Sequence, residues 1–140
     1  MKALSVRQPW AWAVARGHKD VENRSWTTAH RGPLLLHASM RVDLDACASP
    51  LILDAGWRAD DPVAAIGAII AVVDLADVCA ASAPASGTAC ECGTWAQPGT
   101  YHWRLTNPRI LARPVLALGR LGLWEPADSL IAELPAELTH

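Results

Sequence analysis

The chain has 140 residues, of which 51% are hydrophobic and 19% are charged, and its formal net charge is −2. This size suits one domain with its own core, and the composition excludes a disordered chain. No apolar run reaches the roughly 18 residues of a membrane-spanning helix. Near the N-terminus, Arg7 interrupts the apolar residues too early for a signal peptide. We therefore expect a single domain over residues 1–140, in the cytoplasm and without a membrane partner.

The first half of the chain predicts three strands and two helices. The strands are expected at residues 3–6, 21–27 and 34–39, with a turn at Gly32-Pro33. The helices are expected at residues 9–17 and 43–55, because each has apolar residues at helical spacing and a glycine at its end.

The first predicted helix begins with a proline, which suits the first turn of a helix because its missing N–H is no loss there. Its apolar face is formed by Trp10, Ala13, Val14 and Gly17. Trp12 and Arg16 are expected on the other side, with the arginine covering the indole rather than leaving an exposed stacking patch.

The second half predicts mainly strands. The most apolar stretch, residues 65–78, is expected to be a long central strand. Residues 80–99 lack periodicity and predict a loop, and loops of this length are usually functional or mobile. Further strands are expected at residues 101–105 and 110–118, around a turn at Asn107-Pro108, and at 121–124. A final helix over residues 128–134 is expected to be capped by Asp128. Together these elements predict an α+β fold, a small and partly closed β-barrel flanked by helices.

The charge is distributed unevenly along the chain. Residues 1–41 hold seven of the twelve lysines and arginines and two of the fourteen carboxylates, so the rest of the chain is acidic. A locally basic surface attracts polyanions even when the net charge is negative. The first third is therefore the place where we expect phosphate groups to bind.

The four cysteines, Cys47, Cys79, Cys90 and Cys92, are interpreted as reduced thiols, because no export signal is expected. The pair Cys90-x-Cys92, with Cys79 before it and His102 after it, would be able to supply four zinc ligands. The spacing argues against this, since structural zinc sites usually place two or more residues between paired cysteines. We expect no metal and no cofactor.

Two further residues are interpreted structurally. Asp74 lies in the most apolar segment, where an unpaired carboxylate is costly, and we expect it to pair with an arginine. His37 shares a strand face with Ser39, and we expect a hydrogen-bonded histidine at the barrel edge. Ser39 is a candidate donor to a ligand.

The stretch from Gly17 to Arg24 concentrates opposite charges where a helix ends and a strand begins. In a regular strand, Glu22, Arg24 and Trp26 point to one face, and Lys19 joins them only from the turn. Glu22 would then orient both cations and leave donors for an incoming polar or anionic group. The alternative is an exposed ion-pair ladder on an edge strand, which spacing alone favours.

The pattern Gly-x-Lys-x-x-Glu-x-Arg resembles the signature of the ASCH domain family, named for activating signal cointegrator-1 homology. The flanking segments are also similar: Leu4-Ser5, Gln8-Pro9-Trp10, Arg24-Ser25-Trp26 and His30-Arg31-Gly32. The resemblance is close from Leu4 to Ser39. It is less specific at residues 73–75, 107–109 and 121–124, which look like landmarks of bacterial members. The insertion at residues 80–99 has no counterpart.

The resemblance implies a PUA-like fold, a small β-barrel of about six strands flanked by two to three helices, with a cleft between barrel and helices. It places at this cleft Gln8, Pro9, Trp10, Lys19, Glu22 and Arg24. In physical terms, the cations suit phosphates or base edges, and a tryptophan offers a stacking face. Trp10 and Trp26 are each either core residues or stacking platforms.

Two classes of function follow from the resemblance. The first is a module that binds RNA, another nucleic acid or a modified nucleotide through the cleft. The second is a small hydrolase, a ribonuclease or an amidohydrolase acting on acetylated cytidine, in which Lys19 and Glu22 are the catalytic candidates. The amidohydrolase relatives carry threonine at the position of Glu22, which favours binding. A protein-binding scaffold that uses the 80–99 loop is a third possibility.

Overall fold

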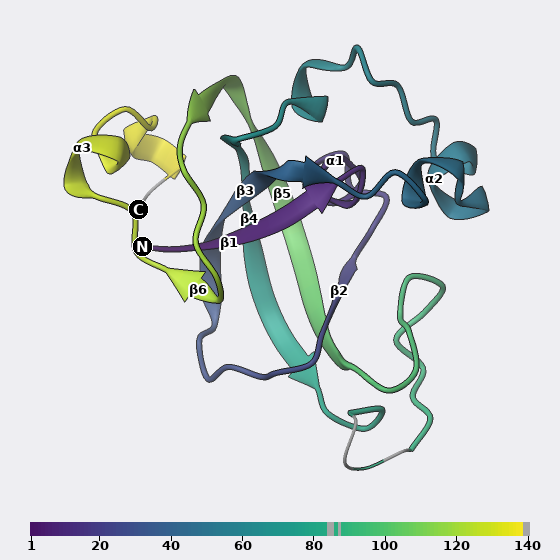
Figure 1. Ribbon diagram of the computed structural model, residues 1–140. Coiled ribbons are helices and arrows are strands. Elements are labelled where there is room, and N and C mark those ends of the chain that lie inside the picture. The colour runs from purple at the N-terminus through teal and green to yellow at the C-terminus, as the bar shows by residue number, and fades with distance from the viewer. Residues whose placement is uncertain (84–85, 87, 139–140) are drawn as a thin grey trace.

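A curled six-stranded sheet forms the body of the computed structural model, which describes residues 1–83, 86 and 88–138 (Figure 1). The strand order across the sheet is β2-β5-β4-β3-β1-β6. The strands are β1 (Lys2–Gln8), β2 (Val21–Arg24), β3 (Gly32–Val42), β4 (Ala68–Cys79), β5 (Tyr101–Leu116) and β6 (Leu123–Trp124). In the described residues, no pairing joins the edge strands β2 and β6, so the sheet is an open half-barrel.

The helices are short. They are α1 (Trp10–Ala15), α2 (Pro50–Asp54) and α3 (Asp128–Ile131), with 3-10 turns at Ala46–Ala48, Pro62–Ala64 and Ala136–Leu138. Figure 1 shows α2 and α3 on opposite sides of the sheet. None of the helices in the described part of the chain is long and apolar enough to cross a lipid bilayer. The predicted α+β class, a small barrel-like sheet of six strands with three helices, is confirmed.

Both faces of the central strands are buried. In β3, Leu34 and Leu36 pack on the same side as α1, whereas Leu35 belongs to a second cluster with Trp124 and the C-terminal segment. Successive side chains of a strand point to opposite faces, so a strand covered on both sides is apolar throughout. This double coverage explains the unbroken leucine run and the equally apolar β4.

Two predicted turns are wrong: Gly32-Pro33 begins β3 and pairs with β4, and Asn107-Pro108 lies inside β5. Residues 101–118 were expected to be two strands around Asn107-Pro108, but β5 runs through this dipeptide as one strand. Asn107 takes a left-handed backbone conformation, with φ of 51°, and the β4–β5 register shifts nearby. An irregular residue of this kind bends a strand without reversing it. Asp74 of β4 lies opposite Thr106 and pairs with Arg109, as expected for a structural carboxylate.

The helix expected over residues 43–55 is broken. Ser49 is extended, with ψ of 134°, and Pro50 begins α2. Proline lacks the N–H of a continuing helix and disfavours a helical residue before it, so the helical spacing around it does not produce one helix. The last helix begins at Asp128 and ends at Ile131. Its capping position is occupied by Ala127, so the predicted Asp128 cap is also wrong.

The outer side of α1 is also buried. Trp12 was expected on the other side of this helix with Arg16 covering its indole; it is 3% exposed and packs edge-on against Trp57. Its indole Nε1 donates to the Asp61 carboxylate at 2.9 Å, and Arg16 forms an ion pair with the same carboxylate. Segments far along the chain therefore cover α1, and helical periodicity alone does not reveal such coverage.

Candidate functional site

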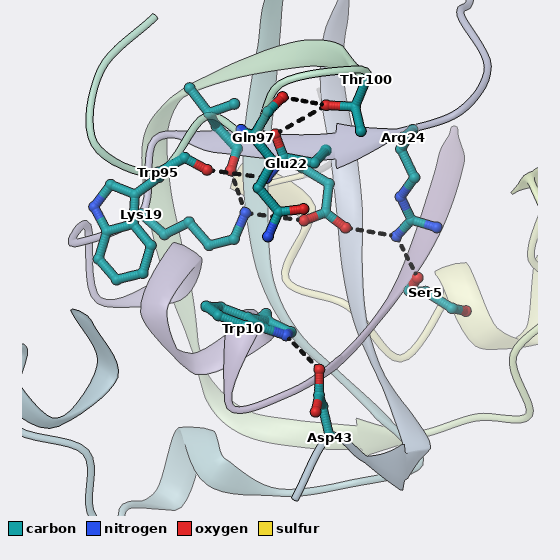
Figure 2. A network of polar contacts seen from close by, with 11 residues as sticks. Ser5, Trp10, Lys19, Glu22, Arg24, Asp43, Trp95, Gln97 and Thr100 are labelled. Carbon is teal, nitrogen blue, oxygen red and sulfur yellow. Dashed lines mark hydrogen bonds and ion pairs between the residues drawn. The ribbon is translucent and has the colours of Figure 1, made fainter. Parts of the chain in front are cut away.

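A cleft of about 890 Å³ opens at the end of β1, between α1 and the edge of the sheet. Its volume lies in the range of roughly 300–1,000 Å³ typical of small-ligand sites. Residues from well-separated parts of the chain line it: 5–7, 10, 19, 22–24, 37, 39–41, 43, 51, 94, 95, 97 and 118–122. Figure 2 shows the polar network on its wall.

The lysine and arginine of the motif meet on one carboxylate. Lys19 Nζ lies 3.0 Å from Glu22 Oε1, and Arg24 Nη2 lies 2.7 Å from Glu22 Oε2 (Figure 2). Lys19 also donates to the Val21 carbonyl, and Arg24 donates to the Ser5 carbonyl at 2.9 Å. The carboxylate thus holds one cation on each oxygen, and the three side chains form one ordered cluster.

The end of α1 produces this arrangement. Gly17 adopts a φ of +80°, which stops the helix, and the N–H groups of His18 and Lys19 then both donate to the Ala13 carbonyl. Such left-handed glycines are common helix terminators. The chain folds back so tightly that Lys19 is buried just before β2 begins. The expectation that Lys19 joins its partners from the turn is met by this geometry.

Glu22 is held as an anion. Burial alone would raise its pKa, but attraction to Lys19 and Arg24, together with their hydrogen bonds, outweighs burial and leaves the pKa below its usual value. The side chain is 10% exposed, whereas that of Arg24 is 23% exposed. Arg24 is therefore the member of the cluster that solvent and ligands reach best.

Arg24 retains a free donor. Its Nε is buried and has no hydrogen-bond partner among the described residues. A buried polar N–H without a partner costs roughly 1–3 kcal/mol, so most are satisfied. Because Nε is closed to solvent, a ligand in the cleft reaches the exposed remainder of the Arg24 side chain rather than this atom.

Two tryptophans form the aromatic part of the wall. Trp10, at the start of α1, donates from Nε1 to Asp43 at 3.0 Å, and Lys19 Nζ lies 5.8 Å from the ring centre. Trp95, from the loop before β5, packs edge-on against Trp10 with ring centres 6.3 Å apart. Asn23 of β2 fixes that loop by donating to the Trp95 carbonyl at 2.9 Å. Both rings are half-buried, so part of each faces the cleft.

Three exposed arginines surround the opening: Arg7, Arg41 and Arg120. Within the part of the chain that the structure describes, no carboxylate pairs with any of them. The lining also contains Lys19 and Arg24 but, as acids, only Glu22 and Asp43. The cleft is thus electropositive in a protein of negative net charge.

A serine and a histidine meet at the floor. Ser5 Oγ lies 2.9 Å from His37 Nδ1, and His37 Nε2 lies 2.7 Å from the Ala117 carbonyl. A carbonyl only accepts, so Nε2 carries the proton and the serine hydroxyl donates to Nδ1. Burial lowers the pKa of His37, and the bond to Ala117 opposes this in part. The prediction of a hydrogen-bonded histidine is confirmed.

Other residues predicted at the site lie elsewhere or play another part. Gln8 is 1% exposed, and its amide donates to the Val63 and Ala65 carbonyls. These bonds connect β1 to the 3-10 turn at Pro62–Ala64. Pro9 is buried next to it. Trp26 packs edge-on against Trp103, with ring centres 4.7 Å apart. These three side chains do not line the cleft.

The remaining predicted residues line the cleft. They are Trp10, Lys19, Glu22, Arg24 and Ser39. Ser39 Oγ is occupied locally, since it bonds to the backbone of Arg41. Trp95 and Arg120 also line the cleft, although the sequence analysis did not predict them. Trp95 is a lone tryptophan in a loop of small and polar residues, and this feature could have identified it.

Comparisons with known proteins identify relatives of this chain. The ASCH domain family matches residues 4–114. Activating signal cointegrator 1 of Homo sapiens is 55% identical over 38 residues, which are 27% of this chain and 6% of that protein. Its Mus musculus counterpart is 56% identical over 36 residues, 26% of this chain and 6% of that protein. The matches therefore span a small part of these long relatives, whereas the family match covers most of this chain, which belongs to the ASCH domain family.

Proposed function

We propose that the protein binds RNA, with one nucleotide seated in the cleft. The observation that carries this proposal is the convergence of an ordered Lys19–Glu22–Arg24 cluster, an aromatic wall and unpaired arginines on one hollow. Arginine forks and aromatic faces are the groups that hold phosphates and unstacked bases. The family membership and the basic first third of the chain support the same class of ligand.

Each group has a distinct part in this proposal. The arginines at the opening contact phosphates, because they are exposed and have no competing carboxylate. Arg24, the most exposed member of the cluster, donates to the base or to the nearest phosphate. Trp10 and Trp95 provide a stacking surface, and Lys19 and Glu22 hold Arg24 and Trp10 in position.

The test compares single-stranded RNA, DNA of the same sequence and a mononucleotide, each titrated at two salt concentrations. The variants are Arg41→Ala and Arg120→Ala, with Arg113→Ala as the matched control, because Arg113 is exposed but lies outside the cleft. We expect each cleft variant to weaken RNA binding by roughly three- to tenfold and to reduce the salt slope by about one, as for a lost phosphate contact. Equal weakening by the control, or unchanged binding in both cleft variants, would refute the proposed surface.

The hydrolase alternative is tested with the same preparations. A low pKa makes Glu22 a weak base, and both of its oxygens are committed to cations, which favours binding over catalysis. Incubation with acetylcytidine and with a mixed RNA, followed by detection of acetate or of cleavage products, separates the two. Turnover that disappears in Lys19→Ala would favour the hydrolase instead.

A further inference from the structure

Four metal-binding side chains gather outside the cleft. Cys79 ends β4 and lies directly opposite His102 of β5, and Cys90 and Cys92 come from the connection between these strands. Their sulfur and nitrogen atoms all lie within 4.8 Å of one another. In Figure 1 this connection leaves the end of β4 and returns to β5 at the lower right.

The histidine is oriented as a ligand. Its Nε2 lies 2.6 Å from the Gln97 carbonyl, which only accepts, so the proton is on Nε2. Nδ1 therefore presents a lone pair, and Cys90 Sγ lies 3.0 Å from it. Metal-bound histidines commonly donate their second nitrogen to a carbonyl in this way. His102 is 1% exposed, so this orientation is fixed.

We propose that Cys79, Cys90, Cys92 and His102 bind one Zn²⁺ ion. Zinc takes four tetrahedral ligands at about 2.3 Å for sulfur and about 2.0–2.1 Å for nitrogen, which places neighbouring ligand atoms of such a site roughly 3.5–3.8 Å apart. The observed cluster reaches this geometry with shifts of about an ångström or less. The three thiols release their protons to solvent on binding, and the resulting site carries a charge of −1.

In the sequence, the close spacing of Cys90 and Cys92 argued against a metal site. In the structure, this spacing is compatible with one. In an extended chain, residues two apart point to the same side, so both thiols reach one ion. The other two ligands come from a paired strand ladder, which the spacing of the cysteines does not show. Three thiolates and one imidazole favour zinc over the oxygen-seeking cations.

The site would anchor a long segment that has little core of its own. Gln97, whose carbonyl accepts from His102, also donates its N–H to Asn23 of β2 at 2.9 Å. Asn23 in turn holds Trp95 at the cleft. Metal binding contributes folding free energy to such loops. The ion would therefore hold in place the loop that provides part of the cleft wall.

The test begins with metal analysis of the untagged full chain, purified in reducing buffer with added Zn²⁺ and then desalted. The variants are Cys90→Ser and Cys92→Ser, with Cys47→Ser as the matched control, since Cys47 is also half-buried but lies outside the cluster. We expect about one zinc per chain in the parent and control and a loss of most of it in the cluster variants. Zinc below roughly a tenth of an ion per chain in the parent would refute the proposal.

Cobalt provides a second readout. Co²⁺ added to the metal-free protein should give tetrahedral ligand-field bands and thiolate charge-transfer absorption in the parent and in Cys47→Ser, but weakened bands in Cys90→Ser. Zinc should displace Co²⁺. Octahedral cobalt spectra, iron in place of zinc, or a disulfide within the cluster under reducing conditions would each overturn the zinc site.

A last experiment tests whether the zinc site affects the cleft, and it rests on the proposed function. Removal of zinc with a chelator should lower the melting temperature of the parent but not that of Cys90→Ser, and should weaken RNA binding by roughly threefold or more. A parent that holds zinc but binds no RNA would refute the proposed function and leave the metal site standing. RNA binding by a parent protein that holds no zinc would refute the metal site and leave the proposed function standing.

Discussion

The Glu22→Gln variant tests the electrostatic cluster most directly. The change removes one negative charge and keeps nearly the same shape. It leaves Lys19, whose side chain is 3% exposed, and Arg24 without a counter-charge. Glutamine still offers one oxygen, which accepts a hydrogen bond from one of the two cations.

The expected cost follows from burial. Removing one partner of a buried ion pair costs about 3–5 kcal/mol. Arg24 is 23% exposed, so water compensates part of its loss, and the remaining amide oxygen retains one hydrogen bond. We therefore expect the free energy of unfolding to fall by roughly 2–3 kcal/mol at pH 7, which corresponds to about 6–12 °C in melting temperature for a chain of this length.

The pH dependence of the stability difference between parent and variant provides a second measurement. The pKa of Glu22 is lower in the folded protein than its usual 4.5, so its contribution is fully present above about pH 4.5 and is lost as the pH falls through the folded pKa. Urea unfolding followed by tryptophan fluorescence should show a difference between parent and variant that is largest at pH 7 and shrinks toward pH 3.

The control for this experiment is Asp20→Asn. Asp20 is exposed and lies between Lys19 and Glu22 in the sequence, so its replacement should change stability by less than about 0.5 kcal/mol. A Glu22→Gln variant that loses less than about 1 kcal/mol at pH 7, or whose loss is the same at pH 7 and pH 3, would show that the carboxylate does not hold the cluster together.

Two further predictions concern stability. Hydrogen bonds from Arg16, then from the Val63 N–H and Trp12, outweigh partial burial and lower the pKa of Asp61 to about 2. Asp61→Ala should therefore lower the free energy of unfolding by roughly 1–2 kcal/mol, after allowance for the solvent around the arginine. In thermal melts this loss should fade between about pH 4 and pH 2, and a loss that persists at pH 2 would contradict the prediction. Gly119→Ala would place a Cβ 2.6 Å from the ring of buried His37 and should cost about 1–3 kcal/mol by overpacking; a variant that melts with the parent would contradict this packing.

The members of the motif cluster are neighbours in sequence, but their spacing alone favoured an exposed ion-pair ladder, and the family resemblance was what indicated a shared cleft. A glycine ends the helix, and the two-residue period of β2 then places Glu22 and Arg24 on one side. What the sequence did not reveal is that Lys19 is buried and points toward Trp10. That depends on the covering strands, and local spacing contains no information about them.

The sequence by itself determined the α+β class, the family motif and the positions of most strands, since these follow from local periodicity and from residues close together in the chain. The tertiary structure decided which side chains meet from afar: Trp95 against Trp10, and Cys79 and His102 beside the Cys90–Cys92 pair. It also buried Trp12 and continued β5 through Asn107 as one strand. Contacts between distant segments depend on how the whole sheet curls and pairs, and no short stretch of sequence specifies that arrangement.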